Sequence, residues 1–242
     1  MAEPRTIEPG SLQIATSSPF PPFAVEREGT DSGFDAELMR AVCGKLGLRW
    51  NLVRFDGADC NSIFDGLRTG DYDAVAAATV ITADREKVAL FSEPYLEVAQ
   101  ALVVNTATSG HVTSTDDLAS KVVGVETGRT SVGVADELLG AGQLRDVRRY
   151  PCGGLPGAVE DLLAGRVGGV LTLAPVATWF ARDHDELTVV QTLETDERLG
   201  IAFAPGNVTL RDAVNEALEV CRSDGILERL ERRWMHEGGS AR

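Results

Sequence analysis

Two periodicities alternate along the first half of the chain. Short apolar runs at residues 12–16, 50–55 and 73–79 are typical of buried strands. Between them, residues 34–46 show apolar positions at helical spacing and are bounded by glycines, and residues 61–67 show a similar pattern. Strand, helix, strand, helix, strand with short connections predicts a largely parallel sheet with helices on its faces.

The second half repeats this order. Residues 121–125, 147–150 and 167–173 predict strands, and residues 132–139 and 159–163 predict helices. The fold class expected is therefore α/β, with two Rossmann-like lobes that contain mixed, mostly parallel sheets.

Two further apolar strands predict how the lobes are connected. Lobe 1 is expected to contain residues 1–104 and 199–242, including an amphipathic helix over 210–234, and lobe 2 residues 105–198. Hinge strands are expected near 101–105 and 197–203. Two lobes joined by hinge strands would enclose a cleft.

Ligands of open α/β sheets bind beyond the carboxyl ends of the strands. This rule places residues 16–23, 79–85, 126–130 and 172–175 around one space. Arg129 lies in the third of these segments and is expected to line the ligand site.

Composition excludes several functions. Acidic residues outnumber basic ones by 37 to 23, the net charge is −14, and no basic patch is interleaved with aromatic residues, so a nucleic-acid partner is not expected. No apolar run reaches the ~20 residues that span a bilayer. The four cysteines form no C-x-x-C motif, and neither a metal-ligand cluster nor a phosphate-binding glycine loop is present. We therefore expect no cofactor and no metal, and a monomeric protein.

The N-terminal residues leave the compartment open. Residues 1–16 lack the apolar segment of a signal peptide. If Met1 is the native start, the sequence predicts a cytoplasmic protein. If Met1 replaces an export signal, it predicts a periplasmic or cell-surface protein, secreted or lipid-anchored.

A series of short motifs resembles one family over residues 12–234. The chain is similar to the family 3 extracytoplasmic solute-binding proteins, which supply polar amino acids to ABC transporters. The motifs that match are Pro21-Pro22-Phe23, Gly33-Phe34-Asp35, Gly70-Asp71-Tyr72-Asp73-Ala74, Ile81-Thr82-x-x-Arg85, Phe91-Ser92-x-Pro94-Tyr95, Val123-Gly124-Val125-x-Thr127-Gly128-x-Thr130, and Ser223-Asp224-Gly225 with Trp234.

The resemblance implies the type II periplasmic-binding-protein fold, often called a Venus flytrap, in which two lobes close on a ligand. It also implies that an exported protein would deliver the ligand to ABC permease subunits. An amino-acid-like ligand or a small organic acid is the expected partner.

The resemblance also assigns an anion clamp. It implies that Arg85 binds the ligand carboxylate, helped by main-chain N–H groups near Ala78 and by Thr130 at a helix start. A guanidinium and the N-terminus of a helix both suit a carboxylate. The alternatives are a surface ion pair of Arg85 with Asp84 or Glu86, and a helix-capping role for Thr130.

Three more positions are assigned by the resemblance to the ligand space. Phe20 matches an aromatic residue that stacks on the ligand side chain, and core filling is its alternative. Cys60 falls where family members usually have a bulky apolar or aromatic residue opposite that aromatic ring. We therefore expect Cys60 to line the pocket and not to be reactive. Thr172 belongs to the second-lobe strand end that faces the ligand.

Departures from the family pattern change the expected ligand. Amino-acid binders hold the α-ammonium with a carboxylate where this chain has Leu173, and with a hydroxyl where it has Val80; residues 77 and 78 are alanines where serine and glycine are usual. Ser17 replaces an aspartate used for cationic side chains. Because an unpartnered buried ammonium is costly, the sequence predicts a small acid without the amine.

Two other functions stay open. Cyclohexadienyl dehydratases resemble the same family, but only Glu126 is a candidate acid here, and it is expected to be a solvated loop residue. A ligand-sensing domain of a larger receptor, or a copy that binds nothing, is the remaining alternative.

Overall fold

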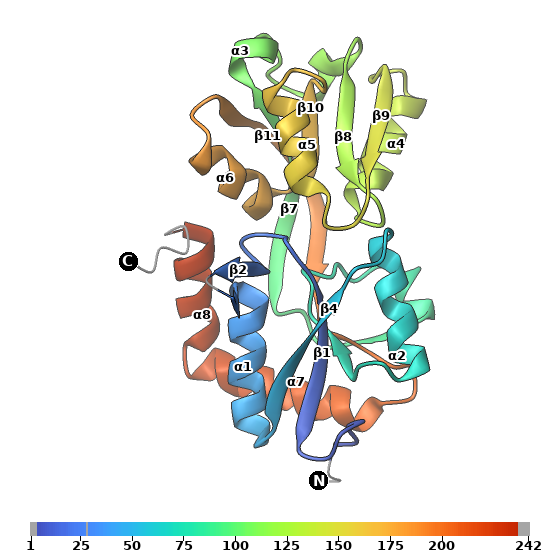
Figure 1. Cartoon of the computed structure of the whole chain (residues 1–242), viewed down its shortest axis with the longest axis vertical. Helices are drawn as coiled ribbons and strands as arrows, with labels where there is room; N and C mark the ends of the chain where they lie inside the picture. The colour runs from blue at the N-terminus through green and yellow to red at the C-terminus, as the bar shows by residue number, and fades with distance from the viewer. Residues whose placement is uncertain (1–3, 28, 237–242) are drawn as a thin grey trace. The chain divides into compact units, whose positions relative to one another are not determined.

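The computed structural model describes residues 4–27 and 29–236 (Figure 1). The chain divides into two compact units. Unit 1 comprises Met1–Phe55, Ser62–Glu97 and Arg198–Arg242, and unit 2 comprises Asp56–Asn61 and Val98–Glu197. In the described residues, no helix is both long and apolar enough to span a membrane.

Unit 1 is built on a mixed five-stranded sheet in the order β4-β1-β5-β12-β6. Strand β1 pairs in parallel with β4 and β5, whereas β12 pairs antiparallel with β5 and β6. A short hairpin of β2 and β3 is separate from this sheet. The bounds are β1 Ser11–Ser17, β2 Val25–Arg27, β3 Thr30–Ser32, β4 Arg49–Phe55, β5 Ala74–Val75, β6 Leu90–Phe91 and β12 Ala202–Phe203.

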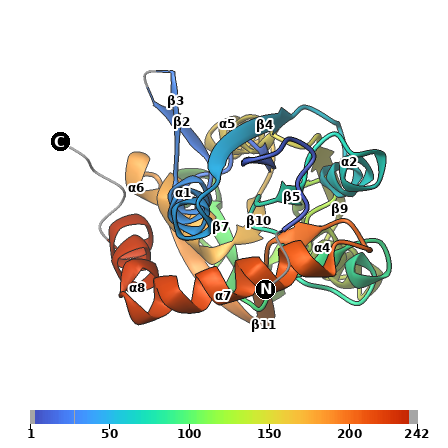
Figure 2. The same ribbon diagram turned by 90° about the horizontal axis from the view of Figure 1, so that it is seen from below.

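Helix α1 packs against the C-terminal helices α7 and α8 (Figure 2). Gly33, with a φ of 116°, precedes α1, and an added Cβ there would lie 2.2 Å from the Phe23 carbonyl oxygen. Only glycine fits, which explains this part of the Gly-Phe-Asp motif. The bounds are α1 Phe34–Leu46, η1 Cys60–Phe64, α2 Asp65–Thr69, η2 Arg85–Lys87, α7 Val208–Ser223, α8 Ile226–Glu231 and the π-turn η4 Arg232–His236.

Unit 2 contains a second five-stranded sheet in the order β11-β7-β10-β8-β9. Strands β10, β8 and β9 are parallel, and β10 pairs antiparallel with β7. Helices α4 and α5 pack against β8, β9 and β10 (Figure 1). The bounds are β7 Leu96–Asn105, α3 Thr106–Ser109, η3 Thr115–Leu118, β8 Val122–Glu126, α4 Ser131–Gly140, β9 Asp146–Tyr150, α5 Leu155–Leu163, β10 Gly169–Leu173, α6 Ala174–Asp183 and β11 Leu187–Leu199.

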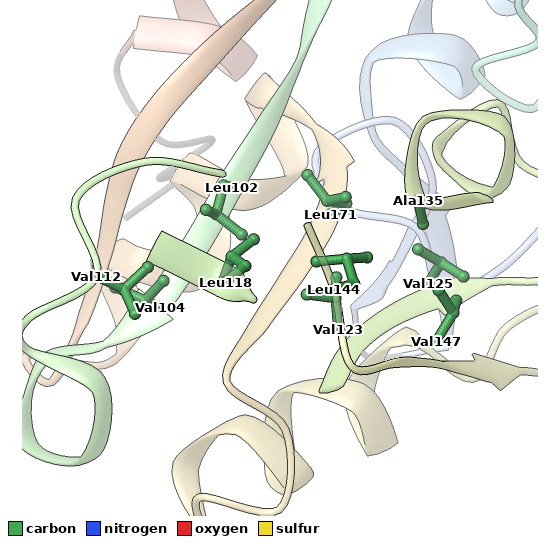
Figure 3. Close-up of a cluster of buried hydrophobic side chains, with 10 residues drawn as sticks. All are labelled: Leu102, Val104, Val112, Leu118, Val123, Val125, Ala135, Leu144, Val147 and Leu171. Atoms are coloured by element: carbon green, nitrogen blue, oxygen red, sulfur yellow. The ribbon is translucent and has the colours of Figure 1, made fainter. Parts of the chain in front are cut away.

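The core of unit 2 is almost entirely aliphatic. Its side chains alternate along β7 and β8, so those of each strand lie on one face of the sheet. Figure 3 shows the cluster, which consists of Leu102, Val104, Val112, Leu118, Val123, Val125, Ala135, Leu144, Val147 and Leu171.

Several predicted elements differ from the structure. The strand predicted over 73–79 is only Ala74–Val75, because Ala78 adopts a positive φ and ends the extended run. The C-terminal helix is interrupted at Gly225, whose φ is 67°. Helix α6 was not predicted; its Pro175 lies in the first turn, where proline is tolerated. Residues 56–61, predicted in lobe 1, belong to unit 2.

Candidate functional site

Arg85 lies in a short 3-10 turn rather than in the first turn of an α-helix. Its Nη1 donates to the Val80 carbonyl oxygen at 2.8 Å, and its main-chain N–H donates to Thr82 Oγ1 at 3.3 Å. The guanidinium carbon is 5.6 Å from the centroid of the Phe64 ring, within the range of a cation–π contact. These contacts fix the position of the cation within unit 1.

The neighbouring acidic residue Asp84 has a different partner. Lys87 Nζ lies 2.6 Å from Asp84 Oδ1, and this hydrogen bond lowers the pKa of the Asp84 carboxyl. Both side chains are exposed. The pair belongs to the solvated surface and does not explain why Arg85 is oriented toward Val80.

Ala78 adopts a φ of 48°, in the left-handed region that usually requires glycine. Its N–H donates to Asp35 Oδ2 at 2.6 Å, and Asp35 Oδ1 accepts from the Tyr95 hydroxyl at 2.8 Å. The carboxylate of Asp35 is buried in the first turn of α1. The Ala78 N–H therefore donates to Asp35 in this conformation, and the prediction that N–H groups near Ala78 bind the ligand anion stays a prediction.

The predicted apolar residues of unit 1 are well packed. Phe20 is 1% exposed, and its ring stacks on Phe23 with centroids 6.1 Å apart. Val80 is buried and forms an isolated bridge with Leu199. Ser17 is the buried last residue of β1, in register with Phe55. The ligand roles of Phe20, Val80 and Ser17 stay predictions.

Thr130 precedes α4, but its side chain does not cap the helix. Its Oγ1 donates to Glu197 Oε2 at 3.0 Å and accepts from Gln100 Nε2 at 2.9 Å. Gln100 Nε2 also donates to Glu197 Oε1 at 3.0 Å. Because the Thr130 hydroxyl donates its only hydrogen to Glu197, this side chain cannot also donate to a ligand carboxylate in this arrangement. The capping alternative is wrong, and the ligand role of Thr130 stays a prediction.

Leu173 and Thr172 lie at the end of β10 and are buried. In the antiparallel register with β7, Leu173 is opposite Gln100 and Thr172 is opposite Ala101. The strand pairing thus places the apolar Leu173, where family members have a carboxylate, beside the polar cluster that contains Glu197.

Glu126 is not the solvated loop residue that the sequence predicts. It ends β8, is 2% exposed, and forms an ion pair in which Arg129 Nε lies 2.8 Å from Glu126 Oε2. Its other oxygen accepts from the Gly153 N–H at 2.7 Å. Glu126 therefore connects the loop before α4 to the loop before α5, and it positions Arg129.

Cys60 forms a disulfide with Cys152, which lies 92 residues away. The Cys152 N–H donates to the Ala58 carbonyl oxygen beside the disulfide, and the Cys60 N–H donates to the Thr127 carbonyl oxygen in the loop after β8. Gly128 has a φ of 82°, and a Cβ there would collide with residues 59–61. Sequence reasoning missed this bond because no spacing rule joins cysteines so far apart. The pocket-lining role of Cys60 stays a prediction.

Unit 1 also contains a small pocket lined by residues of β1, β3, α1 and β4. Two of its hydroxyls, Thr16 Oγ1 and Ser32 Oγ, are buried without a hydrogen-bond partner in the structure. None of the predicted site residues lines this pocket. Within residues 4–27 and 29–236, no three acidic, histidine or cysteine side chains are grouped so that they could hold a metal ion.

Comparisons with known proteins agree with this architecture. Residues 12–237 match the family model described as bacterial extracellular solute-binding proteins, family 3. The putative ABC transporter arginine-binding protein 2 of Escherichia coli (strain K12) is 29% identical over 233 residues, which cover 94% of this chain and 91% of that protein.

Solved structures give the same result. An ancestral arginine-binding protein bound to arginine superposes with a TM-score of 0.85 and 32% identity, covering 93% of this chain and 98% of that one. An ancestral amino acid-binding protein, a precursor of cyclohexadienyl dehydratase, gives a TM-score of 0.84 and 29% identity, covering 93% of this chain and 96% of that one.

Proposed function

Because the chain belongs to the family 3 bacterial extracellular solute-binding proteins, we propose that it is the binding component of an ABC-type importer and that its ligand is a small carboxylate-bearing solute. The family resemblance expected from the sequence motifs is confirmed, as is the two-lobe α/β fold of type II periplasmic binding proteins. The ligand and the residues that contact it are our inference.

The setting of Arg85 is the observation that best supports a carboxylate. The hydrogen bond to the Val80 carbonyl and the face of Phe64 hold the guanidinium in one orientation. A pre-oriented guanidinium loses little entropy when it binds a planar carboxylate through two parallel hydrogen bonds. This favours an anion-binding role over a surface role.

The side chains at Val80 and Leu173 argue against an ordinary α-amino acid. Both are buried and apolar, so the positions that family members use for the α-ammonium offer no acceptor. The relatives named above bind arginine or other amino acids; we infer that this chain keeps their carboxylate clamp but binds its ligand without that ammonium contact.

The disulfide supports a location outside the cytoplasm. Disulfides persist in oxidising compartments and are rare in the cytosol, and the matched family is described as extracellular. We infer an exported protein that releases its ligand to a permease. Glu126, paired with Arg129 and Gly153, gives no specific support to the dehydratase alternative.

A thermal-shift screen over keto acids, aromatic acids, aliphatic acids, dicarboxylates and amino acids tests the proposal. A ligand at one hundred times its Kd adds ~2.7 kcal/mol to the free energy of unfolding, which should raise Tm by about 5–10 °C in a chain of this size. Arg85→Ala should abolish the shift, whereas Lys87→Ala, in the same turn, should retain it. The proposal fails if no carboxylate shifts Tm, or if the shift survives Arg85→Ala.

A further inference from the structure

The small pocket of unit 1 is lined by its sheet, the β2–β3 hairpin and helix α1. Ile14 and Thr16 of β1 lie on the same face of the sheet, because side chains two residues apart in a strand point the same way, and Leu52 of β4 is in register with Ile14. Ser32 lines the pocket from β3 and Met39 lines it from α1. All of the lining residues belong to unit 1, so the pocket is a feature of this unit alone.

Two hydroxyl groups of this pocket are buried. Thr16 is 4% exposed, and neither Thr16 Oγ1 nor Ser32 Oγ has a hydrogen-bond partner among residues 4–27 and 29–236. A hydroxyl that is removed from water without a replacement partner raises the free energy of the folded state. Because buried polar groups in proteins are almost always hydrogen-bonded, two such hydroxyls in one pocket indicate a polar occupant.

The size of the pocket limits what this occupant can be. Its cavity volume is about 10 Å³, which is enough for one water molecule and too small for a ligand of several heavy atoms. Three more polar residues, Ser18, Asp31 and Asp35, line the same pocket. A buried water needs such a polar site, because it usually makes about three hydrogen bonds to the protein.

The β2–β3 hairpin is held beside this face of the sheet by ion pairs. Arg54 of β4 is in register with Thr16 of β1, so the two side chains lie on the same face. Arg54 pairs with Glu26 of β2 and with Asp31 of β3, and the Arg54 side chain is half exposed. These pairs connect the hairpin to the sheet at the surface, next to the two buried hydroxyls.

We propose that one ordered water molecule binds in this pocket and bridges Thr16 Oγ1 and Ser32 Oγ. Water suits both groups, because a hydroxyl can donate one hydrogen bond and accept others, as water does. The bridge connects β1 to a hairpin that forms a separate two-stranded sheet. It is the buried counterpart of the Arg54 ion pairs, and it does not depend on the ligand proposed above.

A high-resolution crystal structure of the wild type tests the site directly. We expect an electron-density peak about 2.5–3.0 Å from each of the two hydroxyl oxygens, the distance of an O–H···O hydrogen bond. An empty pocket would overturn the proposal. A peak bonded to only one of the two hydroxyls would also overturn it, because the bridge would be missing.

Thr16→Val tests the same site by the sign of its effect on stability. Valine replaces the hydroxyl with a methyl group of similar size. Loss of the water bridge should raise the unfolding equilibrium constant about fivefold, because Ser32 Oγ also loses its partner. In a dry pocket, the substitution would remove an unpartnered hydroxyl and lower the constant, which would contradict the proposal. Urea unfolding measures the constant.

Two matched variants serve as controls. Thr16→Ser keeps the hydroxyl and should retain the electron-density peak. Thr30→Val makes the same chemical change at the exposed first residue of β3 and should leave both the peak and the unfolding constant unchanged. Loss of the peak in Thr30→Val would contradict its assignment to Thr16 and Ser32.

Ser32→Ala removes the other partner and keeps the proposal testable if Thr16→Val does not fold. It should also abolish the peak and raise the unfolding constant. In the double variant, the constant should rise by less than the product of the two single factors, because both substitutions disrupt one water. A rise equal to that product would show that the hydroxyls act independently and would contradict a shared water.

Discussion

Each unit contains a buried carboxylate, and the two carboxylates differ in the kind of group that donates hydrogen bonds to them. In unit 1, Asp35 accepts from the main-chain N–H of Ala78 and from the hydroxyl of Tyr95. In unit 2, Glu197 accepts from the side chains of Gln100 and Thr130. The first carboxylate holds a backbone turn with a positive φ, whereas the second is surrounded by side chains that can reorient.

The two carboxylates differ in how directly they constrain the backbone. The Asp35 carboxylate holds the turn at Ala78, in the segment that leads to Arg85. The partners of Glu197 are side chains, so Glu197 constrains the backbone less directly. The following predictions examine each side of this comparison.

The largest effect on stability is expected from the disulfide of unit 2. Replacing both Cys60 and Cys152 with serine should lower the free energy of unfolding by about 2–4 kcal/mol, because the bond closes a long loop. Urea unfolding of the wild type and the variant, with and without reductant, measures this loss in the free energy of unfolding. Reductant should shift the wild type toward the variant and leave the variant unchanged. An identical midpoint for both proteins would show that unit 2 does not depend on this bond.

Asp35→Asn is expected to have a somewhat smaller effect, about 2–3 kcal/mol. The substitution removes the charge that accepts from the Ala78 N–H, and a main-chain donor in a strained turn cannot reorient. Glu197→Gln should cost less than about 1 kcal/mol, because the hydroxyl of Thr130 can exchange donor and acceptor roles.

Chemical denaturation of both variants measures this contrast. Glu37→Gln, in the same first turn of α1, removes only a partly exposed ion pair with Arg233 and should cost about 1 kcal/mol or less, so it is the control. Equal losses for Asp35→Asn and Glu197→Gln would contradict the distinction between a carboxylate bound by a main-chain donor and one bound by side chains.

The smallest effect concerns acid stability in unit 2. A hydrogen bond from Tyr150, with others from Arg166 and Arg148, lowers the pKa of the Asp161 carboxyl from 3.8 to about 2. Because the folded-state pKa is the lower one, Asp161 contributes its full stability above about pH 4 and loses it as the pH falls through about 2.

Asp161→Asn should therefore destabilise the protein by no more than about 1 kcal/mol at neutral pH, since surface pairs are screened, and the difference from the wild type should vanish near pH 2. The midpoints of urea unfolding for the two proteins, measured from neutral pH to about pH 2, give this difference in stability. Glu160→Gln, exposed on the same helix, is the control and should have little effect on stability at neutral pH. A difference that persists at pH 2 would rule out this carboxylate as its source.

The sequence predicted those features that depend on local pattern. Helix α1 begins and ends where Gly33 and Gly47 predict, and β1 and β4 match their apolar runs within one residue. The ligand role of Arg85, inferred from its motif, stays a prediction. Each of these depends on residues close together in the chain.

Features that depend on distant contacts were not predicted. The Cys60–Cys152 bond joins residues 92 positions apart. Glu197 lies in a charged run that looks solvated, although alternation places Leu193, Thr195, Glu197 and Leu199 on one face of β11. That period of two was the available signal, and it was missed because the hinge strand was expected only near residues 197–203, whereas β11 begins at Leu187.

The most direct test of the carboxylate-binding function is a calorimetric titration of the strongest acid from the thermal-shift screen into wild type and Arg85→Ala. We predict that one ligand binds per wild-type chain. Arg85→Ala should weaken the affinity about one hundredfold or more, because the ligand carboxylate would lose the guanidinium that pairs with it. Equal affinity for the two proteins would contradict the assignment of Arg85 as the carboxylate clamp.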